Sequence, residues 1–106
     1  MTFERWDIYF ALVPHEEDPS VKERHPVLIW NETEAFLITF GMTSTYRGDR
    51  GMEYQLKDWA LSGLDHETSV RLHRYVQIDK NDVQEKVGTV QFADRLAIER
   101  KLLNNG

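Results

Sequence analysis

Runs of apolar residues at fixed spacing predict strands in the first third of the chain. Every second residue from Trp6 to Leu12 is apolar, which predicts a strand over residues 7–13 that Pro14 ends. A polar loop follows, and we expect it to continue to about His25. Residues 27–30 then form a short continuous apolar run, typical of a strand buried on both faces.

The middle of the chain continues this strand pattern. Residues 35–39 predict a third strand, which we expect to run on toward Thr45. Residues 52–56 predict a short fourth strand, and residues 59–64 one helical turn closed by glycine. Over residues 70–78, one parity is mostly polar and the other mostly apolar, so we expect a half-solvated fifth strand.

The last third of the chain changes from strand to helix periodicity. Residues 79–86 are a charged connection that suits a short strand or a turn. Residues 91–104 predict a helix, with Phe92, Leu96 and Leu103 expected to form its buried stripe. The patterns together predict a mainly β (α+β) fold: a small, curved antiparallel sheet with one C-terminal helix packed on it.

Composition places the chain among ordinary globular proteins. Its 106 residues, 41% hydrophobic and 29% charged, suit a single domain over residues 1–106. The chain has no cysteine, which excludes disulfides, thiolate zinc sites and cysteine nucleophiles and suits a cytoplasmic location. No apolar run approaches the roughly 18–20 residues that span a bilayer, and no signal peptide is visible, so we expect no membrane association.

Charge and motif content narrow the function classes. The formal net charge of −5 argues against tight non-specific binding to DNA or RNA, although a locally basic groove or a basic partner is compatible with it. The sequence contains no P-loop, no G-x-G-x-x-G and no serine elbow. We therefore expect no nucleotide cofactor.

Two histidines stand beside acidic residues. His15 is followed by three carboxylates, and His66 lies between Asp65 and Glu67. Neighbouring residues on a short loop rarely point at one ion, and no second ligand set is spaced to close a metal site. Solvated acidic loops are the favoured interpretation.

Two further clusters carry residue types that bind phosphate. Arg71, His73 and Tyr75 share one side of the fifth predicted strand and suit a phosphate or a stacked base, although an ordinary solvated sheet face is favoured. Residues 43–47 (Thr-Ser-Thr-Tyr-Arg) end the third predicted strand. Their hydroxyls and guanidinium suit a phosphodiester, and a plain polar strand end is an equal alternative.

Short motifs in a fixed order give the chain a family resemblance. They are a first strand with Asp-Ile-Tyr, a Pro-Val-Leu-Ile strand, a Thr-Ser pair, a Gly-Leu element, a Ser-Val-Arg-Leu strand, an Ile-Asp-Lys turn and a Val-Gly pair before the last helix. They lie at residues 7–9, 26–29, 43–44, 63–64, 69–72, 78–80 and 87–88. In this order the chain resembles the MazF/PemK/Kid toxins of bacterial toxin–antitoxin pairs.

The resemblance implies a fold, a reaction and partners. It implies an SH3-like barrel with appended helices, a homodimer and a cognate antitoxin protein. It also implies an endoribonuclease that needs no metal or other cofactor and cuts single-stranded RNA, the 2′-hydroxyl attacking the neighbouring phosphate. That reaction needs a base, stabilisation of the phosphorane, and an acid for the leaving oxygen.

The resemblance also implies which residues act, with two departures from the family pattern. Trp6 stands where the family has glycine, and His25 stands where it has its catalytic arginine, with Arg24 one residue earlier. We expect His25 as the acid/base and Thr43 and Ser44 as hydroxyl donors to the scissile phosphate.

The remaining candidates are expected to bind RNA. They are Arg24, Tyr46, Arg47, Arg71 and His73. Because imidazole lacks the permanent charge and bidentate grip of guanidinium, a weak or inactive relative is an open alternative. Such a protein would act as a protein-binding module, like the gyrase poisons of similar architecture.

Overall fold

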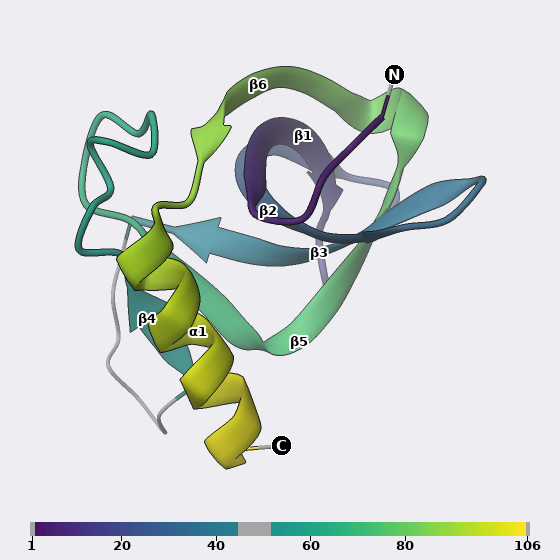
Figure 1. Cartoon of the computed structure of the whole chain (residues 1–106). Coiled ribbons are helices and arrows are strands. Elements are labelled where there is room, and N and C mark those ends of the chain that lie inside the picture. Colours follow the sequence, from purple (N-terminus) through teal and green to yellow (C-terminus); the bar gives the residue numbers. More distant parts are fainter. Residues whose placement is uncertain (1, 45–51, 106) are drawn as a thin grey trace.

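A computed structural model describes residues 2–44 and 52–105. Of the predicted site residues, Tyr46 and Arg47 lie outside these ranges. In the described residues, six strands form one antiparallel sheet in the order β4-β5-β3-β2-β1-β6 (Figure 1). In chain order the elements are β1 (Asp7–Pro14), β2 (Lys22–Glu32), β3 (Phe36–Thr43), β4 (Glu53–Gln55), β5 (Ser69–Asp79), the 3-10 helix η1 (Lys80–Asp82), β6 (Val83–Thr89) and α1 (Phe92–Asn105).

The sheet is strongly curved and stays open. Figure 1 shows β5 and β6 bending around β1, β2 and β3, with α1 beside β4 at the end of the chain. In the described sheet β4 and β6 are the two edges, so the curl does not close into a complete barrel. The predicted mainly β fold with one C-terminal helix is confirmed. No helix of the described residues is both long and apolar enough to cross a membrane.

Side-chain alternation divides the core into two clusters. Val27 and Ile29 belong to one cluster with Tyr9, whereas Leu28 belongs to the other with Phe40. Because successive side chains of a strand point to opposite faces, β2, which lies between β1 and β3, is buried on both sides. The prediction from the continuous apolar run at residues 27–30 is confirmed, since Val27, Leu28 and Ile29 are at most 1% exposed.

The second strand begins earlier than its polar sequence indicated. Residues 22–25 are exposed, so the expectation of a loop up to His25 followed from their composition. In the structure Lys22 pairs with Pro14, and His25 pairs with Ala11. Backbone hydrogen bonds to β1 extend the strand where no apolar periodicity marks it, and His25 lies on a strand rather than in a loop.

Helix α1 buries a different face from the predicted one. Phe92, Leu96 and Leu103 are 71%, 39% and 81% exposed, so the expectation that they form the buried stripe was wrong. The fully buried side chains of α1 are Asp94 and Ile98. The two residues are one turn apart and therefore share a face of the helix. Because each residue turns the helix by about 100°, this face lies roughly opposite the exposed stripe.

A buried carboxylate explains this orientation of α1. Asp94 Oδ1 accepts hydrogen bonds from the Tyr54 hydroxyl (2.6 Å) and the Lys57 amide (3.1 Å), and Oδ2 accepts one from the Asp58 amide (2.9 Å). A buried charge is tolerated only when it is hydrogen-bonded in this way. These contacts fix the start of α1 against β4 and the segment that follows it.

A glycine closes the predicted helical turn at residues 59–64. The amides of Leu64 and Gly63 donate to the carbonyls of Trp59 (3.1 Å) and Ala60 (3.1 Å), which is the Schellman pattern. Gly63 has φ +96°, and a Cβ there would lie 2.2 Å from the Val87 carbonyl oxygen. A glycine is therefore required by both the backbone conformation and the close approach of β6.

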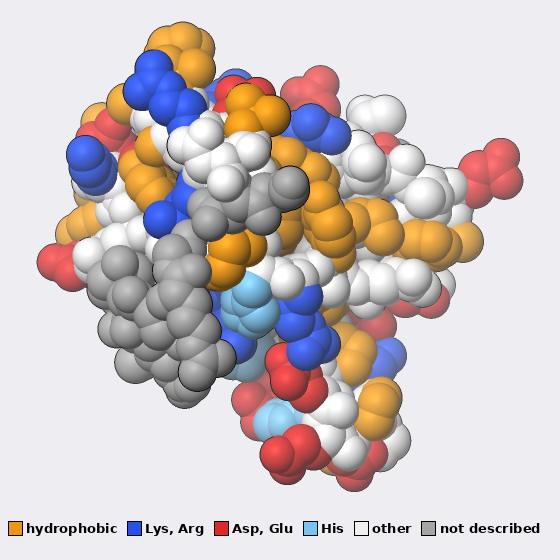
Figure 2. Space-filling model, turned by 90° about the horizontal axis from the view of Figure 1, so that it is seen from below, with side chains coloured by type: hydrophobic (Ala, Val, Ile, Leu, Met, Phe, Trp, Pro, Cys, Tyr) orange, Lys and Arg blue, Asp and Glu red, His pale blue; other side chains and the backbone are white. Residues whose placement is uncertain are grey.

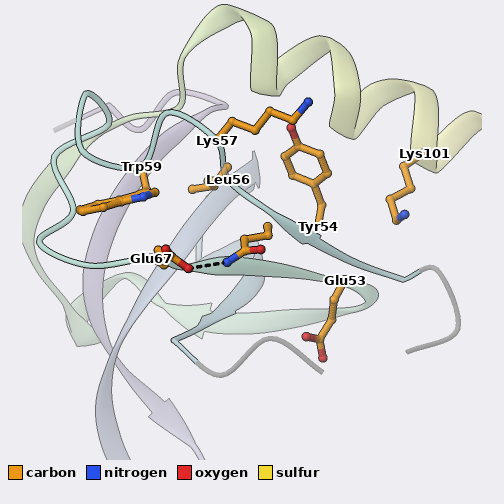
Figure 3. A pocket seen from close by; sticks show the side chains of 8 residues that line it. Glu53, Tyr54, Leu56, Lys57, Trp59, Glu67 and Lys101 are labelled. Carbon is orange, nitrogen blue, oxygen red and sulfur yellow. Dashed lines mark hydrogen bonds between the residues drawn. The ribbon is translucent and has the colours of Figure 1, made fainter. Parts of the chain in front are cut away.

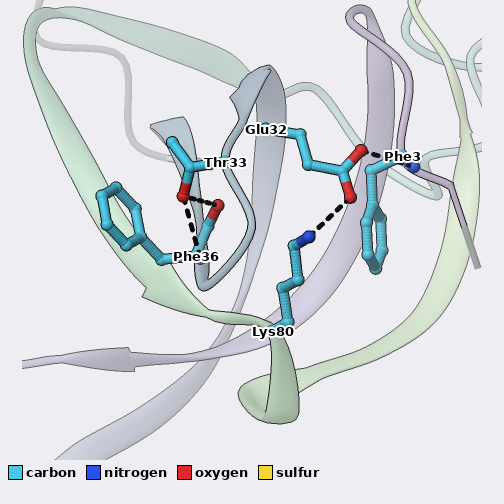
Figure 4. A network of polar contacts seen from close by, with 5 residues as sticks. All are labelled: Phe3, Glu32, Thr33, Phe36 and Lys80. Atoms are coloured by element: carbon cyan, nitrogen blue, oxygen red, sulfur yellow. Dashed lines mark hydrogen bonds and ion pairs between the residues drawn. The ribbon is translucent and has the colours of Figure 1, made fainter.

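A polar network ties the N-terminal segment to the sheet (Figure 4). Glu32 accepts a hydrogen bond from the Phe3 amide (3.3 Å) and pairs with Lys80 Nζ (2.8 Å). The Lys80 ammonium and the Phe3 amide hold the pKa of Glu32 below its ordinary value. In the adjoining turn, Thr33 and Phe36 exchange hydrogen bonds that connect β2 to β3.

Candidate active-site groove

A groove of about 430 Å³ lies where β2 begins and β3 ends, beside β5. Four predicted site residues line it, namely His25, Thr43, Ser44 and Arg71. On the face shown in Figure 2, histidine and Lys/Arg side chains lie side by side, and acidic side chains gather next to them. Residues from three strands, far apart in sequence, therefore meet at one concavity.

Strand pairing explains why these side chains converge. His25 pairs with Ala11 at the open end of the β1–β2 hairpin, and Thr43 pairs with Ser69 at the end of β3. Between Phe40↔Tyr75 and Met42↔Val70, two steps along β3 correspond to five along β5. This bulge changes the direction in which the side chains of residues 71–74 point.

The bulge brings a second arginine into the groove. In a regular strand Arg71 and Arg74 would face opposite sides, because side chains alternate. In the structure both line the groove. Sequence analysis missed Arg74 because it occupies the mainly apolar parity of β5, and only the irregular register turns it.

Glu16 of the β1–β2 connection and Glu23 at the start of β2 contact basic side chains of the groove. Glu23 pairs with His15 Nε2 (2.8 Å) and with His25 Nε2 (3.4 Å), so it bridges two histidines. Hydrogen bonds first from His15 and then from His25 lower the pKa of Glu23. Glu16 pairs with Arg74 Nη1 (2.8 Å) across the groove.

The other basic side chains of the groove lining also have acidic neighbours. His66 Nδ1 lies 2.6 Å from Asp65, and Arg71 Nε lies 4.0 Å from the buried carboxylate of Glu53. Arg71 Nη2 is 3.5 Å from His73 Nε2, and Arg71 Nε is buried without a hydrogen bond in the described part of the chain. Each His or Arg of the described groove lining thus has a carboxylate within 4.0 Å.

Two predicted RNA-binding residues lie outside this lining. Arg24 donates to Gln84 (2.8 Å) and forms an ion pair with Glu85, and its guanidinium lies 3.9 Å from the Phe10 ring centroid. It is therefore held against β6 rather than in the groove. His73 is exposed on β5 and, among the described residues, contacts Arg71 of the groove lining.

Sequence reasoning assigned no role to several residues of the lining. His15, Glu16 and His66 were interpreted as parts of solvated polar loops, yet all three line the groove. Their positions depend on how the hairpin end and the residue 64–68 segment fold against β5. Only the local density of His and acidic residues was visible in the sequence.

A second, more open hollow of about 530 Å³ lies beside β4 (Figure 3). Tyr54, Trp59 and Lys101 are among its lining residues, and Gln55 donates to Glu67 (2.8 Å) at its border. None of the described predicted site residues lines it. Among the described residues, no group of three or more His, Asp or Glu side chains is placed to hold a metal ion.

Solved structures of bacterial toxins share this fold. The Mycobacterium tuberculosis toxin MazF-mt6 aligns with a TM-score of 0.69 and 18% identity over 91% of this chain and 93% of that chain. A mycobacterial endoribonuclease, solved in complex with its cognate antitoxin, aligns with a TM-score of 0.76 and 16% identity over 97% and 93% of the two chains. A comparison with curated protein sequences gives no significant match.

A family model matches nearly the whole chain. Residues 4–105 match the model described as the PemK-like, MazF-like toxin of the type II toxin–antitoxin system. This span includes all six strands of the described residues and the whole of α1. The chain therefore belongs to the PemK-like, MazF-like toxin family.

Proposed function

We propose that this protein is an endoribonuclease toxin that cuts single-stranded RNA without a metal ion, by attack of the 2′-hydroxyl on the neighbouring phosphate. One observation carries the proposal: a single groove collects His25, Thr43, Ser44 and Arg71 in a chain of this toxin family. An imidazole, two hydroxyls and a guanidinium supply the groups that such a transfer needs.

Each side chain has a role that suits its position. His25 takes the proton from the attacking hydroxyl or returns one to the leaving oxygen, since histidine exchanges protons near neutral pH. Thr43 and Ser44 donate hydrogen bonds to the phosphate at the end of β3. Arg71, half-exposed beside them, offsets the charge that develops on the phosphorane.

A second candidate is a catalytically weak or inactive protein of the same fold that binds a protein target. Arg24 favours this alternative, because its ion pair with Glu85 and its contact with Phe10 hold it away from the groove. His25 then has to act without a neighbouring arginine from the same strand. Growth arrest with intact cellular RNA would support this candidate.

We propose a homodimer and a cognate antitoxin as partners. Phe92, Leu96 and Leu103 form an exposed apolar stripe within about 40° on α1. Roughly opposite it, Ile98 is buried in the hydrophobic core, so α1 is apolar on two sides and the stripe suits an equivalent helix of a second copy. An antitoxin partner accords with the family and with the mycobacterial complex, and cellular RNA as the substrate implies action in the cytoplasm.

Cleavage of a long single-stranded RNA in the presence of EDTA tests the catalytic proposal. The wild-type protein is expected to produce fragments with 5′-hydroxyl ends, which polynucleotide kinase labels without prior dephosphorylation. His25→Ala and Thr43→Ala are expected to reduce cleavage at least about 100-fold, the usual scale for an acid/base or oxyanion-stabilising group.

Thr2→Ala is the matched control for Thr43→Ala, because Thr2 is an exposed threonine outside the groove lining. It is expected to cut like the wild type. Equal cleavage by wild type, His25→Ala and Thr43→Ala would show that the assigned roles are wrong. An RNA with 2′-deoxyribose at the cleaved position is expected to resist cutting, and its cleavage would rule out 2′-hydroxyl attack.

A further inference from the structure

Glu53 is a buried carboxylate that has no role in the reaction as described so far. It is the first residue of β4, and its side chain is 5% exposed. Burial of a charged side chain is unfavourable unless an opposite charge or hydrogen-bond donors offset the loss of hydration. The arginine opposite it on β5 supplies such a charge.

Glu53 and Arg71 face each other across two neighbouring strands. They are register partners in the antiparallel pair of β4 and β5. Side chains of such partners leave the same face of the sheet, with their Cβ atoms about 4.5–5.5 Å apart. Glu53 Oε2 lies 4.0 Å from Arg71 Nε. The pairing of the strands therefore keeps the carboxylate beside the guanidinium.

The Nε atom of Arg71 is the part of the guanidinium that lies toward this carboxylate. Nε is buried and makes no hydrogen bond within the described ranges, although the side chain as a whole is 40% exposed. A buried N–H group without an acceptor is unfavourable. An approach closer by about 1 Å brings Nε and the Glu53 carboxylate to hydrogen-bond distance.

The rest of the guanidinium belongs to the groove. Arg71 lines the groove, whereas Glu53 lines the hollow beside β4 (Figure 3). Because Nε is buried, a ligand in the groove meets the terminal nitrogens of Arg71, which form the fork that binds phosphate in bidentate fashion. Glu53 therefore contacts Arg71 from the side away from a bound strand.

We propose that Glu53 is a positioning residue that acts through Arg71. Its carboxylate accepts the Nε–H and so fixes the guanidinium plane with the terminal nitrogens toward the scissile phosphate. The inference rests on the proposed function, because it takes the phosphorane as the group that Arg71 stabilises. A cation that is already oriented needs no rearrangement as negative charge develops, and such preorganisation makes the stabilisation effective.

Steady-state cleavage of an RNA that the wild type cuts, measured at pH 7 with EDTA present, tests this role. Glu53→Gln is expected to lower kcat at least about tenfold and to change KM by less than about threefold, because it disturbs the orientation of a transition-state contact. Glu67→Gln is the matched control and should stay within about twofold of the wild type. Glu67 is an exposed glutamate of the same hollow that accepts a hydrogen bond from Gln55 and lies outside the groove lining.

The effect of Glu53 is expected to disappear when Arg71 is absent. E53Q/R71A should cut as fast as R71A within about twofold, because a positioning residue has no effect without the side chain that it orients. Guanidinium chloride, added well below denaturing concentrations, is expected to raise cleavage by R71A at least about fivefold but cleavage by E53Q/R71A less than about twofold. Equal rescue of the two variants would overturn the inference.

The Nε–H signal of Arg71 in nuclear magnetic resonance spectra gives a readout that needs no RNA. Its cross-peak is identified by its absence from the spectrum of R71A. Exchange of this proton with water is expected to be at least about tenfold faster in E53Q than in the wild type or E67Q, because the N–H loses its acceptor. Unchanged exchange would contradict the proposed contact.

Two further outcomes separate this inference from the proposed function. A folded E53Q that cuts like the wild type would overturn the inference and leave the proposed function standing. A wild type that cuts no RNA would overturn the proposed function and, with it, the role of Glu53. Should E53Q fail to fold, E53D carries the test: its shorter side chain keeps the charge farther from Nε, and cleavage at the wild-type rate would overturn the inference.

Discussion

Replacement of Asp94 by asparagine is expected to destabilise the fold strongly, although the side chains have nearly the same shape. Asp94 is fully buried and accepts hydrogen bonds from the Tyr54 hydroxyl and from the amides of Lys57 and Asp58. These contacts hold the first turn of α1 on the sheet. The carboxylate also lies where the helix dipole favours a negative charge.

The structure sets the size of the effect. Asparagine keeps one oxygen for the Tyr54 hydroxyl and the Lys57 amide, but its NH₂ group then faces the Asp58 N–H. One charge-assisted hydrogen bond is lost, one buried donor is left unpaired, and the other two bonds weaken. Hydrogen bonds to charged groups contribute about 1.5–3 kcal/mol each, so we expect a loss of about 3 kcal/mol. The total free energy of unfolding of a chain of this size is roughly 5–15 kcal/mol.

Urea unfolding at pH 7, followed by far-UV circular dichroism, measures this loss. With a slope near 1.5 kcal/mol per M, the midpoint is expected to fall by about 2 M. Glu34→Gln, which removes one charge from an exposed turn, is the control and should stay within about 0.5 kcal/mol. A change below about 1 kcal/mol for Asp94→Asn would refute the role given to this carboxylate.

Three further predictions concern single side chains. Burial and the Asp94 carboxylate raise the pKa of Tyr54, so between about pH 10 and that raised pKa the folded state keeps a proton that the unfolded state loses. The contribution to stability is therefore full below about pH 10 and falls as the pH rises above it. Urea midpoints measured from pH 9 to 12 should decline less steeply in Tyr54→Phe than in the wild type. Gly63→Ala is expected to lower the free energy of unfolding by about 2 kcal/mol or more, because Gly63 has φ +96° and the new Cβ would lie 2.2 Å from the Val87 carbonyl oxygen. Gly41→Ala is the control in thermal melts and should have little effect, because a Cβ at Gly41 meets nothing within 4 Å. Leu103→Lys is expected to convert a dimer to a monomer in light scattering without lowering the monomer's stability, and a wild type that is already monomeric would contradict the proposed stripe contact.

Much of the fold was predictable because apolar periodicity records burial. Val27, Leu28 and Ile29 are buried on both faces of the sheet, and the continuous apolar run at residues 27–30 indicated it. Residues 22–25 carry no such signal, since their strand is held by backbone hydrogen bonds and their side chains are exposed. For α1, apolar residues on two sides left the packed face undecided, and a polar residue, Asp94, decided it.

Residues of the candidate site were predictable only where the order of the family motifs and the residue type were enough to identify them. The family motifs identified His25 and Thr43, and the structure places both in one groove. Arg74 was not predictable, because its direction depends on a bulge between β3 and β5. Arg24 was favoured by proximity in sequence, yet its partner Glu85 lies 61 residues away on β6.

The two departures from the family pattern have different consequences. Trp6 replaces an expected glycine but keeps the conformation that glycine favours, with φ 81°. The strain of about 1–2 kcal/mol is offset by a T-shaped contact with Trp30 at 5.0 Å and by backbone hydrogen bonds to Ile29 and Val90. Trp6 lies outside the groove lining, so this substitution affects packing. His25 stands in the groove itself, beside Glu23, and any difference in activity from arginine-bearing relatives is therefore expected to arise there.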